Sequence, residues 1–152
     1  MGAAEPKVSL IYGSWNPGEG GPVRTQPNPL NHPFGVDFDG KGNMYIVELK
    51  GGRVHKLTTD NKLVTIAGDG SKGYGGDGGF AKEATFNGMH NVAVTYSGVV
   101  YISDSWNYCI RRIDDSSDTI TTYVGTGKRG FNGDGGPLKK ATFSYIMCIT
   151  MN

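Results

Sequence analysis

Residues 73–79 read Gly-Tyr-Gly-Gly-Asp-Gly-Gly, and a closely similar stretch, Gly-Phe-Asn-Gly-Asp-Gly-Gly, returns at residues 130–136. We call these two stretches the glycine boxes. Ala-Thr-Phe follows at residues 84–86 and again at 141–143, so the spacing is 57 residues at both points (130 − 73 and 141 − 84). Self-similarity at a fixed spacing indicates units that bury their apolar faces by stacking on copies of themselves. The chain is therefore predicted to be a repeat protein.

Each repeat unit contains four short runs rich in Val, Ile, Tyr and Thr, separated by Gly, Asp, Asn and Ser. The first group of residues favours strands and the second favours turns. No segment has a sustained apolar period of 3.6, so helix is expected to be nearly absent. The expected strands are residues 35–38, 43–48, 53–57 and 63–67 in the first unit and 91–95, 99–103, 109–113 and 120–124 in the second. Four antiparallel strands repeated at a fixed length predict an all-β fold made of β-propeller blades.

Four sub-motifs in one order carry a family resemblance. They are the glycine box, Phe-Asn-Gly-Met-His-Asn-Val-Ala-Val at 86–94, Val-Tyr-Ile-Ser-Asp at 100–104 and Asn-Tyr-Cys-Ile-Arg-Arg-Ile-Asp at 107–114. Over nearly all of residues 9–152 the chain resembles NHL repeats, which usually form six-bladed β-propellers. The resemblance implies blades of four antiparallel strands, about two of which this chain supplies.

The resemblance divides the chain into an N-terminal tail, residues 1–8, and an NHL-type propeller segment, residues 9–152. Within the segment we expect an outer strand at 9–13, blades at 34–68 and 90–125, and the inner strand of an incomplete blade at 146–152. Two blades leave apolar faces and strand edges open, so we expect oligomerisation to complete the propeller. A cyclic homotrimer would supply six blades, whereas a dimer would supply four.

Charge and hydropathy argue against two classes of partner. A net charge of +1 and a pI near 7.7 give no electrostatic footprint for nucleic acid. The pair Arg111 and Arg112 is expected to be a solvated edge. No apolar run approaches the roughly 20 residues of a membrane span. We therefore expect neither nucleic acid nor a membrane as a partner; the expected partners are a small-molecule substrate, which the channel site below would bind, and further copies of the chain.

The candidate site lies where the innermost strands begin, because those strands line the central channel of a propeller. The repeat spacing places Phe34, His90 and Met147 at one equivalent position at the channel mouth. In peptidyl-hydroxyglycine amidating lyases, a related group of six-bladed enzymes, a histidine at this kind of position binds catalytic zinc. The resemblance therefore implies a metal-ligand role for His90 alone. A hydrogen-bonded structural histidine is the alternative.

Further candidates for binding lie close to this position in the repeat. Glu48 and Asp104 end the second strands of the two units and form a second polar layer. They either contact a ligand or hold the following turn, which contains Asn107 in the second unit. Asn91 and Trp106 are also candidates for contacts at the mouth.

The predicted function is a metal-dependent hydrolase or lyase that acts on an ester, lactone or phosphoester at the channel mouth. A divalent metal, Zn²⁺ by the resemblance, would lower the pKa of its bound water to about 7 and so create the nucleophile. No Gly-x-Ser-x-Gly setting points to a serine nucleophile instead. Two alternatives remain open: a non-catalytic propeller that binds a protein or small ligand, and a propeller fragment without activity of its own.

Overall fold

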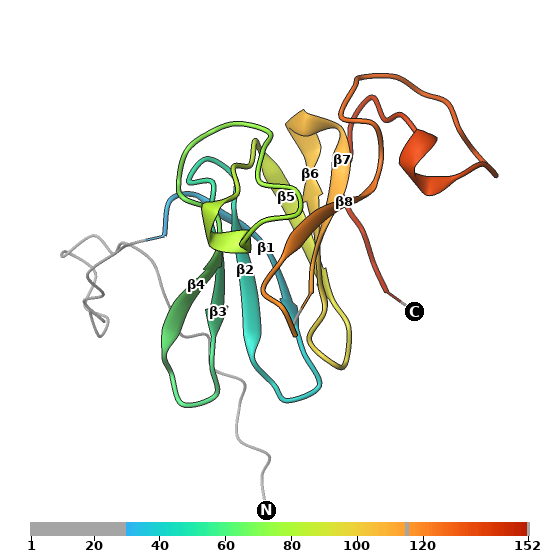
Figure 1. The fold of residues 1–152 in the computed structure, drawn as a ribbon. Helices are drawn as coiled ribbons and strands as arrows, with labels where there is room; N and C mark the ends of the chain where they lie inside the picture. The colour runs from blue at the N-terminus through green and yellow to red at the C-terminus, as the bar shows by residue number, and fades with distance from the viewer. Residues whose placement is uncertain (1–29, 115, 152) are drawn as a thin grey trace, which may run out of the picture. The chain divides into compact units, whose positions relative to one another are not determined.

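The computed structural model describes residues 30–114 and 116–151. Two four-stranded antiparallel sheets lie in one compact unit, Asn31–Asn152, and in each sheet the strands follow sequence order (Figure 1). The first sheet, blade one, consists of β1 (Pro33–Phe38), β2 (Met44–Glu48), β3 (Val54–Leu57) and β4 (Leu63–Ala67). The second sheet, blade two, consists of β5 (Met89–Val94), β6 (Val100–Asp104), β7 (Cys109–Ile113) and β8 (Ile120–Val124).

The prediction of an all-β fold is confirmed. The helical elements of the described residues are three single turns of 3₁₀ helix, η1 (Ala81–Glu83), η2 (Ser105–Asn107) and η3 (Leu138–Lys140). None of these helices is long and apolar enough to cross a membrane. The observed strands agree with the expected ones to within two residues at each end.

The two blades are copies of one unit at the level of strand register. Tyr45 lies opposite Asp37 of β1, and Tyr101, 56 residues later (101 − 45), lies opposite Ala93 of β5. Tyr45 is buried, whereas Tyr101 is half-buried. The difference follows from position, because blade two covers the face of blade one that carries Tyr45.

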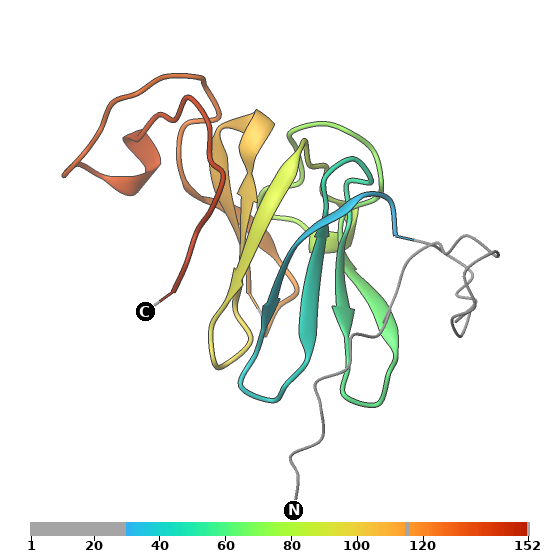
Figure 2. The same ribbon diagram turned by 180° about the vertical axis from the view of Figure 1, so that it is seen from behind.

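The hydrophobic core lies between the two blades, where β1 and β5 run side by side (Figure 2). It includes Tyr45, Val47 and Val54 of blade one, Phe86 of the connection between the blades, and Met89, Val92, Ile102 and Ile120 of blade two. Full burial of one such apolar side chain stabilises the fold by about 1.5–3 kcal/mol. The backbone N–H of Val94 also donates to Asp37 Oδ2 over 2.7 Å and so fixes the two inner strands together.

The first glycine box lies in the connection between β4 of blade one and β5 of blade two. The N–H of Gly78 donates to the carbonyl of Ile120 (2.8 Å), and the N–H of Ile120 donates to the carbonyl of Gly79 (3.1 Å), so the box lies along β8. Gly76 has a φ of +89°, and a Cβ there would lie 2.7 Å from the Cα of Ala84. A residue with a side chain would not fit at that point.

The strand expected at residues 146–152 is not formed; residues 144–151 carry no strand. A strand needs a pairing partner, and none of the described residues supplies one for this segment. Two hydrogen bonds hold the segment to blade two instead. Ser105 Oγ donates to the carbonyl of Ile146, and the N–H of Ile149 donates to Asn91 Oδ1 (3.0 Å). The predicted tail at 1–8 and the predicted outer strand at 9–13 lie outside the described residues.

Candidate functional site

Phe34 and His90 each sit at a β-bulge near the start of an inner strand. The pairing of β1 with β2 shifts register around Phe34, and the pairing of β5 with β6 shifts register around His90. A bulge leaves its extra residue out of the hydrogen-bond ladder and re-aims that side chain, and bulges are frequent beside active sites. The positional equivalence predicted from the repeat spacing is therefore present as a shared backbone feature.

Four aromatic side chains meet at these bulges. The ring of His90 makes edge-to-face contacts with Phe34 (5.0 Å between centroids), Tyr145 (5.1 Å) and Trp106 (6.1 Å). We call these four residues the rim cluster. Phe34 is 54% exposed and Tyr145 is 45% exposed, whereas His90 is buried. Edge-to-face pairs of this kind stabilise beyond their buried area, so the cluster presents an ordered apolar surface.

A chain of hydrogen bonds runs through the rim cluster. His90 Nδ1 lies 2.7 Å from the carbonyl oxygen of Gly88, and His90 Nε2 lies 2.8 Å from Tyr145 Oη. Because a carbonyl oxygen only accepts, Nδ1 carries the proton, and in the neutral ring Nε2 accepts from the Tyr145 hydroxyl. Trp106 Nε1 donates to the same Tyr145 oxygen over 3.2 Å. Both nitrogens of His90 are therefore engaged, as the alternative of a hydrogen-bonded histidine expects.

Backbone geometry fixes Trp106 in place. Trp106 lies in η2, directly after β6, and its N–H donates to the carbonyl of Asn87 (3.1 Å). Gly88 has a φ of +64°, and a Cβ there would lie 2.2 Å from Trp106 Cδ2. The indole thus packs on the bare backbone of a glycine, and a side chain at Gly88 would displace it.

The remaining predicted mouth residues are used differently. Met147 is 55% exposed but makes no ring contact with the cluster. The Asn91 side chain accepts the backbone N–H of Ile149, so it holds the C-terminal segment. Of the residues predicted from the sequence, the structure brings Phe34, His90 and Trp106 together. Tyr145 was not predicted, because it lies in the segment that lacks a regular strand.

Asp104 is fully buried and holds the turn that follows β6. It accepts hydrogen bonds from the N–H of Asn87 (2.8 Å), from Asn107 Nδ2 (2.8 Å) and from Arg111 Nη1 (3.4 Å). Burial raises the pKa of Asp104 to about 6, against the lowering effect of these partners. Asp104 is therefore closed to a ligand at the mouth, and its contact with Asn107 is the one expected of a turn-holding aspartate.

The expectation that Arg111 is a solvated edge is wrong, because its side chain is fully buried. Its Nη2 lies 2.8 Å from Asp77 Oδ1 and donates to the carbonyl of Gly75 over 3.0 Å. Arg111 thereby fastens the first glycine box to blade two. The signal was present in the sequence: Cys109, Arg111 and Ile113 alternate with outward residues in β7, which places Arg111 on the inward face.

Glu48 and His55 occupy the matching positions in blade one with poorer partners. Glu48 Oε1 accepts the N–H of Asn31 (2.6 Å), and His55 Nε2 lies 3.2 Å from the same oxygen without hydrogen-bond alignment. Glu48 Oε2 and His55 Nε2 are buried without a hydrogen-bond partner. Glu48, like Asp104, is closed to a ligand at the mouth.

No group of three or more His, Cys, Asp or Glu side chains within residues 30–114 and 116–151 could hold a metal ion. At the rim cluster the described part of one chain supplies a single imidazole, whose Nε2 accepts the hydroxyl of Tyr145. A metal there would need ligands from outside these residues.

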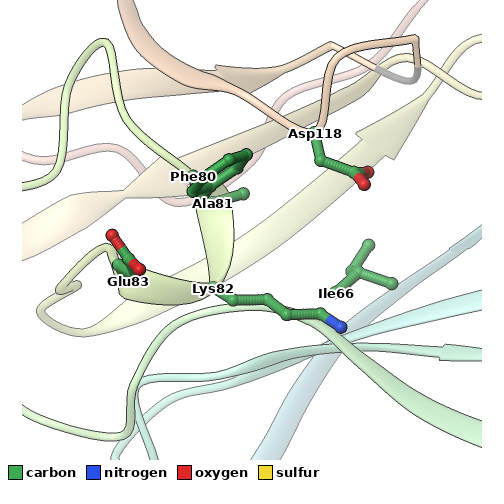
Figure 3. A pocket seen from close by; sticks show the side chains of 6 residues that line it. All are labelled: Ile66, Phe80, Ala81, Lys82, Glu83 and Asp118. Atoms are coloured by element: carbon green, nitrogen blue, oxygen red, sulfur yellow. The ribbon is translucent and has the colours of Figure 1, made fainter.

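Two pockets formed by described residues lie elsewhere. One, of about 240 Å³, lies beside η1, between β4 and the turn that precedes β8; it is lined by Ile66, Phe80, Ala81, Lys82, Glu83 and Asp118 (Figure 3). The other, of about 220 Å³, forms where the C-terminal segment lies against blade two and is lined by Tyr101, Ile110, Tyr123, Val124, Ile149, Thr150 and Met151. Neither includes a residue of the rim cluster.

No protein-family model matches the chain. NHL repeat-containing protein 2 of Gallus gallus is 33% identical over 112 residues, which are 72% of this chain and 15% of that protein. NHL repeat-containing protein 2 of Homo sapiens is 28% identical over 110 residues, with the same coverage of both chains. The chain thus spans about 15% of the length of these curated relatives.

A solved structure of a structural genomics protein of unknown function from Bacteroides thetaiotaomicron is similar, with a TM-score of 0.69 at 22% identity. The similarity covers 83% of this chain and 32% of that chain, and it supports the fold alone. Two four-stranded antiparallel sheets that stack face to face through their inner strands are blades of a β-propeller. Together with the curated relatives, they confirm that the repeats of this chain are of the NHL type.

Proposed function

We propose that the rim cluster is a small-molecule binding site of the propeller. The observation that carries this proposal is the pair of bulges, which turn Phe34 and His90 toward each other at one point. Binding sites combine aromatic walls with a few placed polar groups. Here the half-exposed rings of Phe34 and Tyr145 lie beside one polar group, the hydroxyl of Tyr145. Hydrogen bonds to Trp106 and His90 hold this hydroxyl in position. A site held in this way loses little entropy when it binds.

Trp106 fluorescence tests this proposal directly. In a Trp15→Phe background Trp106 is the remaining tryptophan of the two in the chain. Phenol, which absorbs and emits at shorter wavelength than an indole ring, is expected to change the emission of Trp106 saturably. Phe34→Ala and His90→Ala should each weaken binding about tenfold or more, because the first removes an exposed wall of the site and the second removes the hydrogen bond that positions the Tyr145 hydroxyl.

Phe131→Ala is the matched control, because Phe131 is highly exposed and has no ring contact with the cluster. The Phe131→Ala variant should bind the same aromatic compound with the affinity of the Trp15→Phe background. Equal affinities in all four proteins would place the binding site elsewhere and contradict the proposal.

A second candidate function is a metal-dependent hydrolase or lyase that acts on an ester, lactone or phosphoester. The contact of His90 Nδ1 with the carbonyl of Gly88 favours it, because metal-binding histidines usually donate their other ring N–H to such a group. Nε2 would then have to exchange the Tyr145 hydroxyl for a divalent metal such as Zn²⁺. The bound metal would supply a nucleophilic water at neutral pH.

The further ligands for that metal would come from self-association, and we propose a homotrimer. Phe34, Val36 and Phe38 alternate along β1, and each is about half exposed, so blade one has an open apolar face. Three copies would supply six blades and three imidazoles around one axis. Light scattering should report a trimer, and a stable monomer at micromolar concentration would contradict this assembly.

Elemental analysis paired with an assay on an activated ester tests the metal candidate. We expect about one divalent transition metal per ring, with His90→Ala losing both metal and activity. His55→Ala should retain both, because His55 contacts Glu48 and Thr65 within blade one. Activity that survives chelation and His90→Ala would eliminate the metal candidate while leaving the binding site to its own test.

A further inference from the structure

We infer that the ligand of the rim cluster presents an O–H or N–H donor to Tyr145, an inference that rests on the proposed binding function. The ligand class is an uncharged molecule with an aromatic or other flat apolar body and one hydroxyl or N–H group. The hydrogen bonds within the cluster determine that the ligand donates and that the Tyr145 oxygen accepts.

The Tyr145 hydroxyl has one donor and two acceptor lone pairs. Its donor goes to His90 Nε2, since the Nδ1 proton of His90 is committed to the carbonyl of Gly88. One lone pair accepts the indole N–H of Trp106, which can only donate. Among the described residues nothing else bonds to this oxygen, so one lone pair is left for a ligand, and no proton is left. A ligand carbonyl, ether or carboxylate oxygen would face this lone pair without a hydrogen bond.

The side chains beside the Tyr145 hydroxyl determine the shape and charge expected for the rest of the ligand. Phe34 and Tyr145 each leave about half of their surface open beside the hydroxyl. Within the described residues, no charged side chain is a hydrogen-bond or ring partner of the four cluster residues. An ionic ligand would therefore lose hydration without gaining a counter-charge.

Phenol and anisole provide matched probes, since they share a ring and differ in the hydroxyl proton. Chemical-shift titration of the full chain at pH 8 should show phenol binding about threefold to tenfold more tightly than anisole. Tyr145→Phe keeps the ring and removes the hydroxyl, so it should erase the difference.

The ¹⁵N correlation spectrum of the His90 imidazole gives an independent reading, and we expect the proton on Nδ1 at pH 8. Equal binding of phenol and anisole at the cluster, or a proton on Nε2, would overturn the inference and leave the binding site standing. Binding of both probes at other residues only would overturn the binding site itself. A preference for phenol that persists in Tyr145→Phe would also contradict the inference.

Discussion

Blade one and blade two share strand order and register but differ in the polar groups that anchor their inward faces. The three positions concerned hold Asp104, Asn107 and Arg111 in blade two and Glu48, Gly51 and His55 in blade one. In blade two these side chains satisfy one another and fasten a glycine box. In blade one the buried atoms Glu48 Oε2 and His55 Nε2 have no hydrogen-bond partner among the described residues. A blade is therefore defined by its strand pairing and its apolar positions. The polar side chains at these three positions, which we call the polar anchor, can differ while the blade still forms.

One contact survives in both blades. The N–H of Asn87 donates to Asp104, and the N–H of Asn31, 56 residues earlier (87 − 31), donates to Glu48. Asn107 of blade two also donates from its side chain to Asp104. Blade one has no counterpart of this donor, because Gly51 stands at the equivalent position. A Cβ at Gly51 would lie 1.8 Å from Glu48 Oε2, so the longer glutamate occupies the space that asparagine takes in blade two.

The largest expected effect is from removal of the blade-two anchor. Arg111→Ala leaves the buried carboxylate of Asp104 without its ion pair, and breaking a buried pair in this way costs about 3–5 kcal/mol. His55→Ala removes a side chain that lacks an aligned bond to Glu48, so we expect a cost of about 1 kcal/mol. Urea denaturation of both variants gives the comparison. Equal losses in the free energy of unfolding would show that the polar groups of the two blades stabilise the chain equally.

The next effect is a pH dependence specific to blade two. The pKa of Asp104 in the folded chain, about 6, lies above its ordinary value of 3.8, so the native state holds this proton more tightly. The contribution of Asp104 to the free energy of unfolding is then full below about pH 4 and is lost as the pH rises through 6, a change of about 3 kcal/mol.

Asp104→Asn should remove this slope between pH 4 and pH 6 in urea denaturation. Asp134→Asn, at the exposed aspartate of the second glycine box, is the control and should keep the slope. A slope that persists in Asp104→Asn would assign the titration to another group.

A smaller effect separates the turns before the two inner strands. Gly88 in blade two and His32 in blade one, 56 residues apart (88 − 32), both have a left-handed backbone, with φ of +64° and +56°. A side chain in this region costs about 1–2 kcal/mol. Gly88→Ala should therefore lower the melting temperature and, by moving Trp106, alter its fluorescence. His32→Gly should raise the melting temperature slightly, and a fall would show that the His32 side chain stabilises its turn.

The sequence was sufficient for the fold because the information about it is repeated. Glycine boxes, strand runs and turns recur at one spacing, so each element in one blade supports its counterpart in the other. The equivalence of Phe34 and His90 followed from the same spacing, whereas the bulges that they occupy did not. The inward position of Arg111 is also encoded in the sequence, because residues alternate between the two faces of β7, although its charge alone indicates a solvated side chain.

Tyr145 could not have been predicted in this way. Its repeat counterpart is Gly88, 57 residues earlier (145 − 88), so the spacing gives no reason for an aromatic ring there. Its place depends on how the C-terminal segment lies against blade two. Two hydrogen bonds hold that segment: Ser105 Oγ donates to the carbonyl of Ile146, and Asn91 Oδ1 accepts from the N–H of Ile149. Contacts between segments without a repeated partner leave no pattern in a single sequence.

Mapping small-molecule binding residue by residue tests the central claim, that the bulges build a ligand site. Chemical-shift perturbation of the chain by a set of small aromatic compounds should concentrate on Phe34, His90, Trp106 and Tyr145. Shifts that concentrate instead on the pocket beside Phe80 and Asp118, with the rim cluster unchanged, would contradict the account.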